Sequence, residues 1–134
     1  MDPKLKDLRA FMPTAQLVFL RNASESGEEK EYFIEQINLI HATIQTMPKT
    51  YETESQGWGA TVRLHYFMGG FDWYITEKDA DLDGEGQRQA YGMAHMQEEE
   101  LGYIDIQTII QSGAELDLHW KPCALADVRI RKAA

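Results

Sequence analysis

The chain has 134 residues, of which 43% are apolar, so its length predicts one domain and its composition excludes a chain disordered throughout. The formal net charge is −9, and it is unevenly spread. Residues 22–117 hold 19 Asp+Glu and 5 Lys+Arg, a net charge of −14, whereas the flanking segments carry +5 together. An acidic centre repels phosphate backbones, which disfavours direct nucleic-acid binding through it and favours a basic protein partner.

Two further features concern the compartment. The single cysteine, Cys123, has no second cysteine for an internal disulfide, which favours a reducing environment. The N-terminus lacks the apolar segment of a secretory signal, and no apolar run approaches the roughly 20 residues that span a bilayer. We therefore expect a cytoplasmic protein that has no membrane partner.

The first quarter of the chain predicts a short helix, a strand and a loop. Apolar residues in 3–12 are spaced near one helical face, and Pro13 ends this helix. The apolar run at 14–21 is typical of a strand, and the small polar residues at 22–27 predict a loop.

One long amphipathic helix is predicted at about 27–47. Ser26 and Glu29 have the spacing of a capping box, and Pro48 ends the helix. Apolar residues then recur at steps of three and four, which places them on one face: Phe33, Ile37, Ile40, Ile44 and Met47.

The remainder of the chain is mainly strand-like. A connector at 49–60 precedes five apolar or alternating segments, each bounded by turn residues: 61–68, 72–77, 89–96, 101–104 and 117–121. Within the first, alternation assigns Val62, Leu64 and Tyr66 to one face. Asp105 is positioned to cap a short helix that Gly113 closes.

These elements predict an α+β fold, in which an antiparallel β-meander of about five strands packs with one long amphipathic helix and short helices. We expect a single domain over 1–134, with the meander core at 61–121 and a basic tail at 124–134.

A candidate metal loop lies between the second and third predicted strands. Asp79, Asp81 and Asp83 alternate before Gly84, as carboxylates do at the start of a calcium loop. An EF-hand requires glutamate at its twelfth position, and Ala90 stands there. The loop therefore predicts an acidic hairpin connection, with a weak calcium site as the alternative; no other cofactor is expected.

The sequence contains no recognisable catalytic motif. No serine lies in a Gly-x-Ser-x-Gly elbow, and no pair of ligands has the spacing of a zinc site. Three of the four histidines, His65, His95 and His119, lie on separate predicted strands, which leaves a spatial cluster open.

Acidic and aromatic residues instead alternate along the predicted strands and their connections. Aromatic side chains interleaved with acids point to a protein partner, because nucleic-acid surfaces interleave them with bases. The bulky segment Trp73-Tyr74-Ile75 is either covered on both faces or exposed to a partner on one. The predicted partner-binding residues are Asp72, Trp73, Tyr74, Glu77, Glu98, Glu99, Glu100 and Tyr103.

Residues 64–128 resemble the family called domain of unknown function 2958, small proteins of plasmids, phages and integrative elements. The segments that carry the resemblance, in order, are Leu64-His65-Tyr66-Phe67, Asp72-Trp73-Tyr74-Ile75-Thr76-Glu77, Tyr91-Gly92-Met93-Ala94, Glu100-Leu101-Gly102-Tyr103-Ile104 and Leu118-His119-Trp120-Lys121-Pro122. The resemblance implies a mobile-element setting, often near antirestriction or conjugation genes. It implies no catalytic residues.

Charge and resemblance together predict a non-catalytic, acidic protein-binding module of a mobile genetic element. In its sharper form it inhibits a host defence nucleoprotein, in an anti-restriction or anti-CRISPR role, by occupying a nucleic-acid site. One alternative is a metal-dependent enzyme or calcium-binding protein that uses Asp79, Asp81 and Asp83. Another is an accessory subunit of DNA transfer machinery that grips DNA through the tail residues Arg129, Arg131 and Lys132.

Overall fold

The structure, a computed structural model, describes residues 2–80 and 87–128. Two of the predicted metal ligands and the predicted DNA-gripping residues lie outside the described residues: Asp81, Asp83, Arg129, Arg131 and Lys132.

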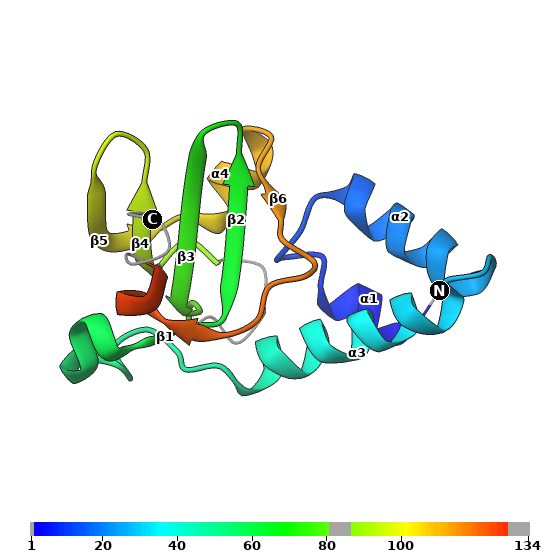
Figure 1. The fold of residues 1–134 in the computed structure, drawn as a ribbon, viewed down its shortest axis with the longest axis horizontal. Coiled ribbons are helices and arrows are strands. Elements are labelled where there is room, and N and C mark those ends of the chain that lie inside the picture. The colour runs from blue at the N-terminus through cyan, green and yellow to red at the C-terminus, as the bar shows by residue number, and fades with distance from the viewer. Residues whose placement is uncertain (1, 81–86, 129–134) are drawn as a thin grey trace.

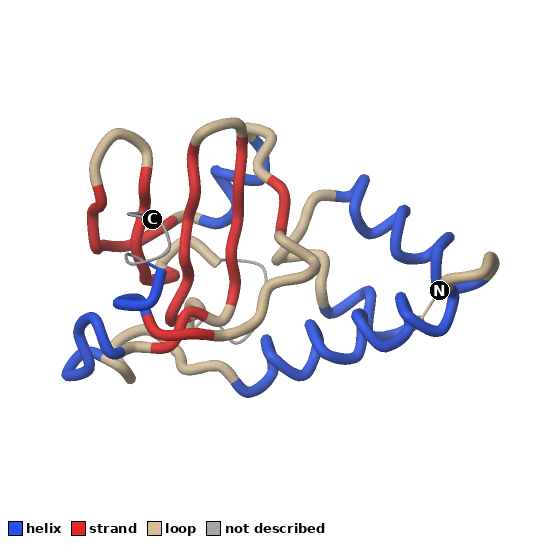
Figure 2. Tube along the Cα trace, in the orientation of Figure 1, coloured by secondary structure: helices blue, strands red, loops and turns tan. Residues whose placement is uncertain are grey.

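The fold is α+β, as predicted, with an antiparallel five-stranded sheet of order β5-β4-β3-β2-β6 (Figure 1). Its strands are β2 (Leu64–Met68), β3 (Phe71–Glu77), β4 (Ala90–His95), β5 (Glu99–Ile104) and β6 (Glu115–Leu116). The helices are α1 (Pro3–Asp7), α2 (Thr14–Glu25), α3 (Lys30–Thr46), the 3₁₀ helix η1 (Glu54–Gly59) and α4 (Ile106–Gln111). A separate two-stranded sheet pairs β1 (Thr61–Val62) with β7 (Cys123–Ala124). Figure 2 shows α1, α2 and α3 grouped beyond β6, with β5 at the opposite side of the sheet.

The strand predicted at 14–21 is wrong, because these residues begin helix α2. Leu17 and Leu20, three positions apart, face the core, and Leu20 is fully buried. The exposed Phe19 packs its ring edge-on against Phe33 of α3, at a centroid distance of 5.3 Å. The period of such a short apolar run does not distinguish a helix from a strand, and packing against α3 makes this one helical. The long helix is accordingly one of a pair.

The capping box predicted for α3 is also absent. Helix α2 continues through Glu25, so Ser26 becomes its C-cap and cannot begin the next helix. Glu29 occupies the N-cap of α3 and makes no side-chain cap hydrogen bond. The buried residues of α3, Ile37 and Ile44, belong to the predicted apolar face.

The final strand predicted at 117–121 is a turn. The strand in this region is β6, which ends at Leu116 and pairs with Tyr66. The N–H of Asp117 still donates to the His65 carbonyl at 2.8 Å, and the chain turns after it. Asp117 Oδ1 accepts the backbone N–H of His119 at 3.0 Å, a local bond that competes with further pairing to β2.

The sheet is covered on both faces. Leu64, Tyr66, Trp73 and Ile75 face a core shared with the N-terminal helices. The opposite face has a smaller core, formed by Tyr74 and Met93 together with Ala60, Val62, Leu125 and Val128. The prediction that Val62 shares a face with Leu64 is therefore wrong, because the ladder breaks at Arg63.

Two polar contacts link the sheet to the N-terminal segment. The buried Tyr66 hydroxyl donates to the Phe11 carbonyl, and burial raises the pKa of Tyr66 above its ordinary value. The Gln16 side chain of α2 bonds both backbone groups of Leu116, each at 2.9 Å, and so covers the β6 edge.

Among the described residues, no helix combines the length and apolarity that crossing a membrane requires.

Candidate functional site

A β-bulge in β3 shapes the main candidate site. Ile75 pairs with Gly92 and Glu77 pairs with the adjacent Tyr91, so Thr76 is the extra residue. Regular alternation would place Glu77 on the same face as Ile75. The bulge instead turns Glu77 to the face of Tyr91.

Gly92 lies opposite this bulge, where the two backbones come very close. A Cβ built on Gly92 would lie 1.9 Å from the carbonyl oxygen of Tyr74. The bulge therefore requires glycine at position 92, because every other residue carries a Cβ.

The Glu77 carboxylate is buried and anchors the loop that follows α3. Its Oε1 accepts the N–H of Tyr51 at 2.7 Å, and its Oε2 accepts the N–H of Thr53 at 2.7 Å and the Thr53 hydroxyl. These donors supply charge-assisted hydrogen bonds to the carboxylate of a buried residue. Among the described residues, no lysine or arginine forms an ion pair with Glu77.

The anchored loop holds Tyr51 in an unusual backbone conformation. Its φ is 77°, a left-handed value that is rare for a bulky residue. Such conformations persist only where surrounding contacts enforce them. Here the N–H of Tyr51 donates to the Glu77 carboxylate. The preceding residue, Thr50, donates both its backbone N–H and its hydroxyl to the Lys78 carbonyl.

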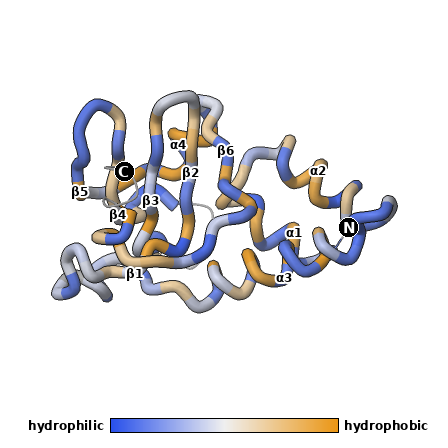
Figure 3. The backbone as a smooth tube through the Cα atoms, in the orientation of Figure 1, coloured by the Kyte–Doolittle hydropathy of each residue, from blue (hydrophilic) through white to orange (hydrophobic). Residues whose placement is uncertain are grey.

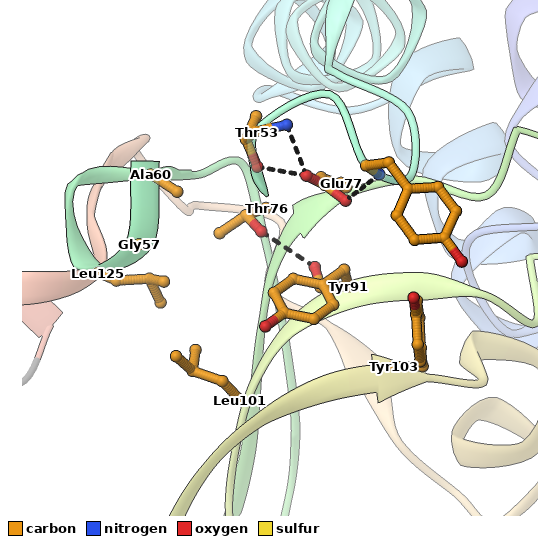
Figure 4. Close-up of a pocket in the computed structure, with 10 residues that line it drawn as sticks. Thr53, Gly57, Ala60, Thr76, Glu77, Tyr91, Leu101, Tyr103 and Leu125 are labelled. Atoms are coloured by element: carbon orange, nitrogen blue, oxygen red, sulfur yellow. Dashed lines mark hydrogen bonds between the residues drawn. The ribbon is translucent and has the colours of Figure 1, made fainter. Parts of the chain in front are cut away.

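These features line a cavity of about 150 Å³, which we call the tyrosine pocket. Its walls are Tyr51, Thr53, Gly57, Ala60, Thr76, Glu77, Tyr91, Leu101, Tyr103 and Leu125. In Figure 4 the rings of Tyr91 and Tyr103 stand on neighbouring strands, and Glu77 is drawn above them, bonded to Thr53. The Tyr103 ring lies 6.1 Å from that of Tyr51 and 5.7 Å from that of Tyr91, nearly perpendicular to both.

A second polar group, the His65 cluster, lies on the same sheet face. His65 Nδ1 is 2.9 Å from Asp117 Oδ2, and Nε2 is 2.7 Å from Asp72 Oδ1. The imidazole also stacks on Tyr74, at a centroid distance of 4.8 Å, and lies 5.0 Å from the Trp120 ring. Both ring nitrogens are thus occupied by carboxylates, which suits a structural link between β2, β3 and the turn after β6.

We expect His65→Phe to lower the free energy of unfolding by about 1–3 kcal/mol, because an aromatic ring is kept while Asp72 and Asp117 both lose the imidazole nitrogen that they contact. Thermal unfolding measures this loss. His41→Phe is the matched control: His41 has one such contact, with Asp7, whose side chain is 57% exposed. Its loss should stay below about 1 kcal/mol, and equal losses in the two variants would contradict the structural role of His65.

The predicted metal ligands and histidines do not converge within the described residues. Asp79 Oδ2 accepts the backbone N–H groups of Arg88 and Gln89, at 3.0 and 3.1 Å, and so closes the base of its loop. His119 contacts the Tyr32 hydroxyl at 2.7 Å, away from His65. No group of three His, Cys, Asp or Glu side chains with the arrangement of a metal site occurs in 2–80 and 87–128.

The predicted partner-binding residues divide into an interior and a surface set. Trp73, Tyr74 and Glu77 are buried, so β3 is covered on both faces. Of these three residues, only Glu77 also lines the tyrosine pocket. Asp72 is half-buried against His65. The exposed members all lie on or beside β5: Glu98, Glu99, Glu100 and Tyr103.

Reasoning from the sequence missed Tyr51 and Tyr91 as site residues. Tyr51 lies in the connector at 49–60, 52 positions before Tyr103, and no local pattern joins them. The only feature of the sequence that pointed to this pocket was the frequency of tyrosine, aspartate and glutamate in the segments that border it.

Comparisons with protein-family models, with curated proteins and with solved structures found no match. The resemblance of residues 64–128 to domain of unknown function 2958 therefore stays a prediction.

Proposed function

We propose that the protein is a non-catalytic binding module that captures a basic protein surface through strand β5 and the turn before it. The observation that carries the proposal is the exposure of Glu98, Glu99 and Glu100 at the end of the sheet. We call Glu98 to Tyr103 the acidic edge.

Along the chain, the acidic edge lies in a segment in which Asp and Glu occur without Lys or Arg. The sequence has no lysine or arginine between Arg88 and Lys121, whereas six acids fall in that interval. Figure 3 shows the hydrophilic tract over the β4–β5 turn and the start of β5. A run of carboxylates attracts and orients a basic partner.

Apolar surface accompanies the charge. Leu101 is 39% exposed and Tyr103 is 56% exposed on one side of β5. On the other, Glu98 and Glu100 border a hollow that also includes Phe71, Ala94, Met96 and Gln97. Carboxylates beside apolar side chains suit lysine and arginine, which carry a charged head on an aliphatic stem.

The two edges of the sheet differ in their availability. Gln16 covers the β6 edge, whereas no strand of the described residues pairs with the outer edge of β5. An extended segment of a partner could add to that edge by backbone hydrogen bonds, a common mode of peptide recognition.

The partner class that this charge favours is a nucleic-acid-binding protein of the host, whose basic surface the acidic edge would occupy in place of nucleic acid. Inhibition of a restriction or CRISPR nucleoprotein is the sharper form, and it rests on the predicted mobile-element setting. Competition by DNA or RNA for the captured partner is the expected consequence.

Changing Glu98, Glu99 and Glu100 together to lysine should weaken capture about tenfold or more, because each substitution replaces attraction by repulsion. Affinity purification from host lysate with mass spectrometry identifies the partner, and calorimetry at low and high salt then measures its affinity. Wild-type affinity should fall steeply with salt.

The matched control changes Glu28, Glu29 and Glu31 to lysine. These residues are exposed around the start of α3, and the variant has the same net charge as the first. Its capture should stay within about threefold of wild type. Equal losses in both variants, or an affinity indifferent to salt, would contradict a site at the acidic edge.

A further inference from the structure

We propose that the tyrosine pocket binds an alkylammonium group, supplied by a lysine side chain of the basic partner. This inference rests on the proposed function and specifies a contact beside the acidic edge. Leu101 and Tyr103 belong both to the acidic edge and to the wall of the tyrosine pocket. A partner segment that lies along β5 would therefore place a lysine side chain beside the pocket.

The three rings supply the aromatic part of a cation site. An aromatic face is electronegative and attracts ammonium groups, and sets of such faces recognise methylated or quaternary nitrogen. The ring of Tyr103 meets those of Tyr51 and Tyr91 at interplanar angles of 76° and 79°, so the faces point in different directions around the cavity. Tyr51 is 62% exposed and Tyr103 is 56% exposed, which leaves the site accessible.

Glu77 supplies the charge. Glu77 is one of the residues that line the pocket, and the three groups that bond its carboxylate are a hydroxyl and two N–H groups, all uncharged. Within 2–80 and 87–128, no lysine or arginine lines the pocket. A negative charge held in a buried, weakly screened position therefore favours entry of a cation.

The local structure is preorganised for this task. The bulge turns Glu77 towards the pocket, and Glu77 in turn holds Tyr51 at its left-handed φ of 77°. The cavity of about 150 Å³ has the volume of about five water molecules, which suits one ammonium head and part of its stem. Strain of this kind, kept next to a cavity, is typical of ligand sites.

Choline is the probe for the pocket, and 3,3-dimethylbutan-1-ol is its uncharged control with the same shape. Titration of each into the protein is followed by NMR of the tyrosine ring protons. Choline should give saturable shifts at Tyr51, Tyr91 and Tyr103, and the neutral alcohol should bind at least about fivefold more weakly. Equal binding of both compounds, or no shift at millimolar choline, would overturn the inference.

Two variants separate the aromatic face from simple bulk. Tyr103→Phe keeps the ring and should bind choline within about twofold of wild type, whereas Tyr103→Leu should lose about fivefold or more. Because Tyr103 is largely exposed, both variants should remain folded, which their thermal unfolding checks. Equal affinity in both variants would show that the ring face has no role.

A hexalysine peptide distinguishes a protein-borne lysine from a small ammonium compound. Its affinity should fall about threefold or more in Tyr103→Leu, and excess choline should compete with it. Choline binding that leaves peptide affinity unchanged in Tyr103→Leu would overturn the assignment to a partner lysine. Changing Glu98, Glu99 and Glu100 to lysine should weaken partner capture about tenfold or more and leave choline binding unchanged. The two measurements therefore test the acidic edge and the tyrosine pocket separately.

Discussion

Gly92→Ala should lower the free energy of unfolding by about 3 kcal/mol or more, the largest stability effect that we expect for one methyl group. The added Cβ would lie 1.9 Å from the Tyr74 carbonyl oxygen. The atom it meets belongs to the backbone of the central strand, so no side-chain rotation relieves the overlap. Strands β3 and β4 must separate or the bulge must move, and either change disrupts the ladder.

Gly102→Ala is the matched control, since Gly102 is the residue of β5 that pairs with Gly92. Nothing lies within 4 Å of a Cβ at position 102, so the variant should be neutral or stabilised by up to about 1 kcal/mol. Urea denaturation compares both with wild type. Equal stability of the two variants would show that β3 and β4 are not in the described register.

The second large effect is expected for Glu77→Gln, which should cost about 1–3 kcal/mol. One carboxylate oxygen becomes an amide nitrogen, which donates and cannot accept. Whichever oxygen is replaced, the N–H of Tyr51 or of Thr53 then faces another donor in a buried position. The loop should detach from β3, and hydrogen exchange at these two amides should accelerate more than in the sheet.

Glu52→Gln makes the same chemical change one residue after Tyr51. Glu52 is exposed, and its Oε1 accepts the N–H of Lys49 at 2.7 Å, a bond that glutamine keeps through its own oxygen. Its stability should stay within about 0.5 kcal/mol of wild type. If Glu77→Gln is equally mild, the carboxylate does not anchor the loop. Choline affinity should also fall in Glu77→Gln, and in Glu52→Gln it should not.

The two sites differ in how they use acidic residues. At the acidic edge, the carboxylates are exposed and screened, so they steer a partner and respond to salt. In the tyrosine pocket, a single buried carboxylate organises a loop and acts over a short distance. Salt should therefore weaken partner capture strongly and choline binding only slightly.

Much of the fold was predictable from local pattern. Alternation in 64–68 identifies strand β2, because a half-buried strand repeats every two residues. Asp105 was expected to cap α4, and its side chain accepts the Thr108 N–H at 3.0 Å. Gly113, expected to close that helix, has a φ of 114°, which glycine adopts without strain.

Two failed predictions have physical causes that the hydrophobic period does not report: a packing surface on another helix in one case, and hydrogen bonds of one side chain in the other. The run at 14–21 became helical because α3 offers a surface for Leu17 and Leu20. Residues 117–121 became a turn because Asp117 bonds both the chain beside it and His65 of β2. Local period cannot report either partner.

The sequence by itself thus determined the α+β class, the approximate positions of strands β2 to β5 and the run of acidic residues at the start of β5. Composition and period are enough for these features, because each depends on residues close together in the chain. Only the tertiary structure decided that Trp73 and Tyr74 are interior, that Glu77 anchors a loop, and that three distant tyrosines line one pocket. The reason lies in the bulge at Thr76: one extra residue reverses the face of Glu77, and the glycine that permits it is on another strand.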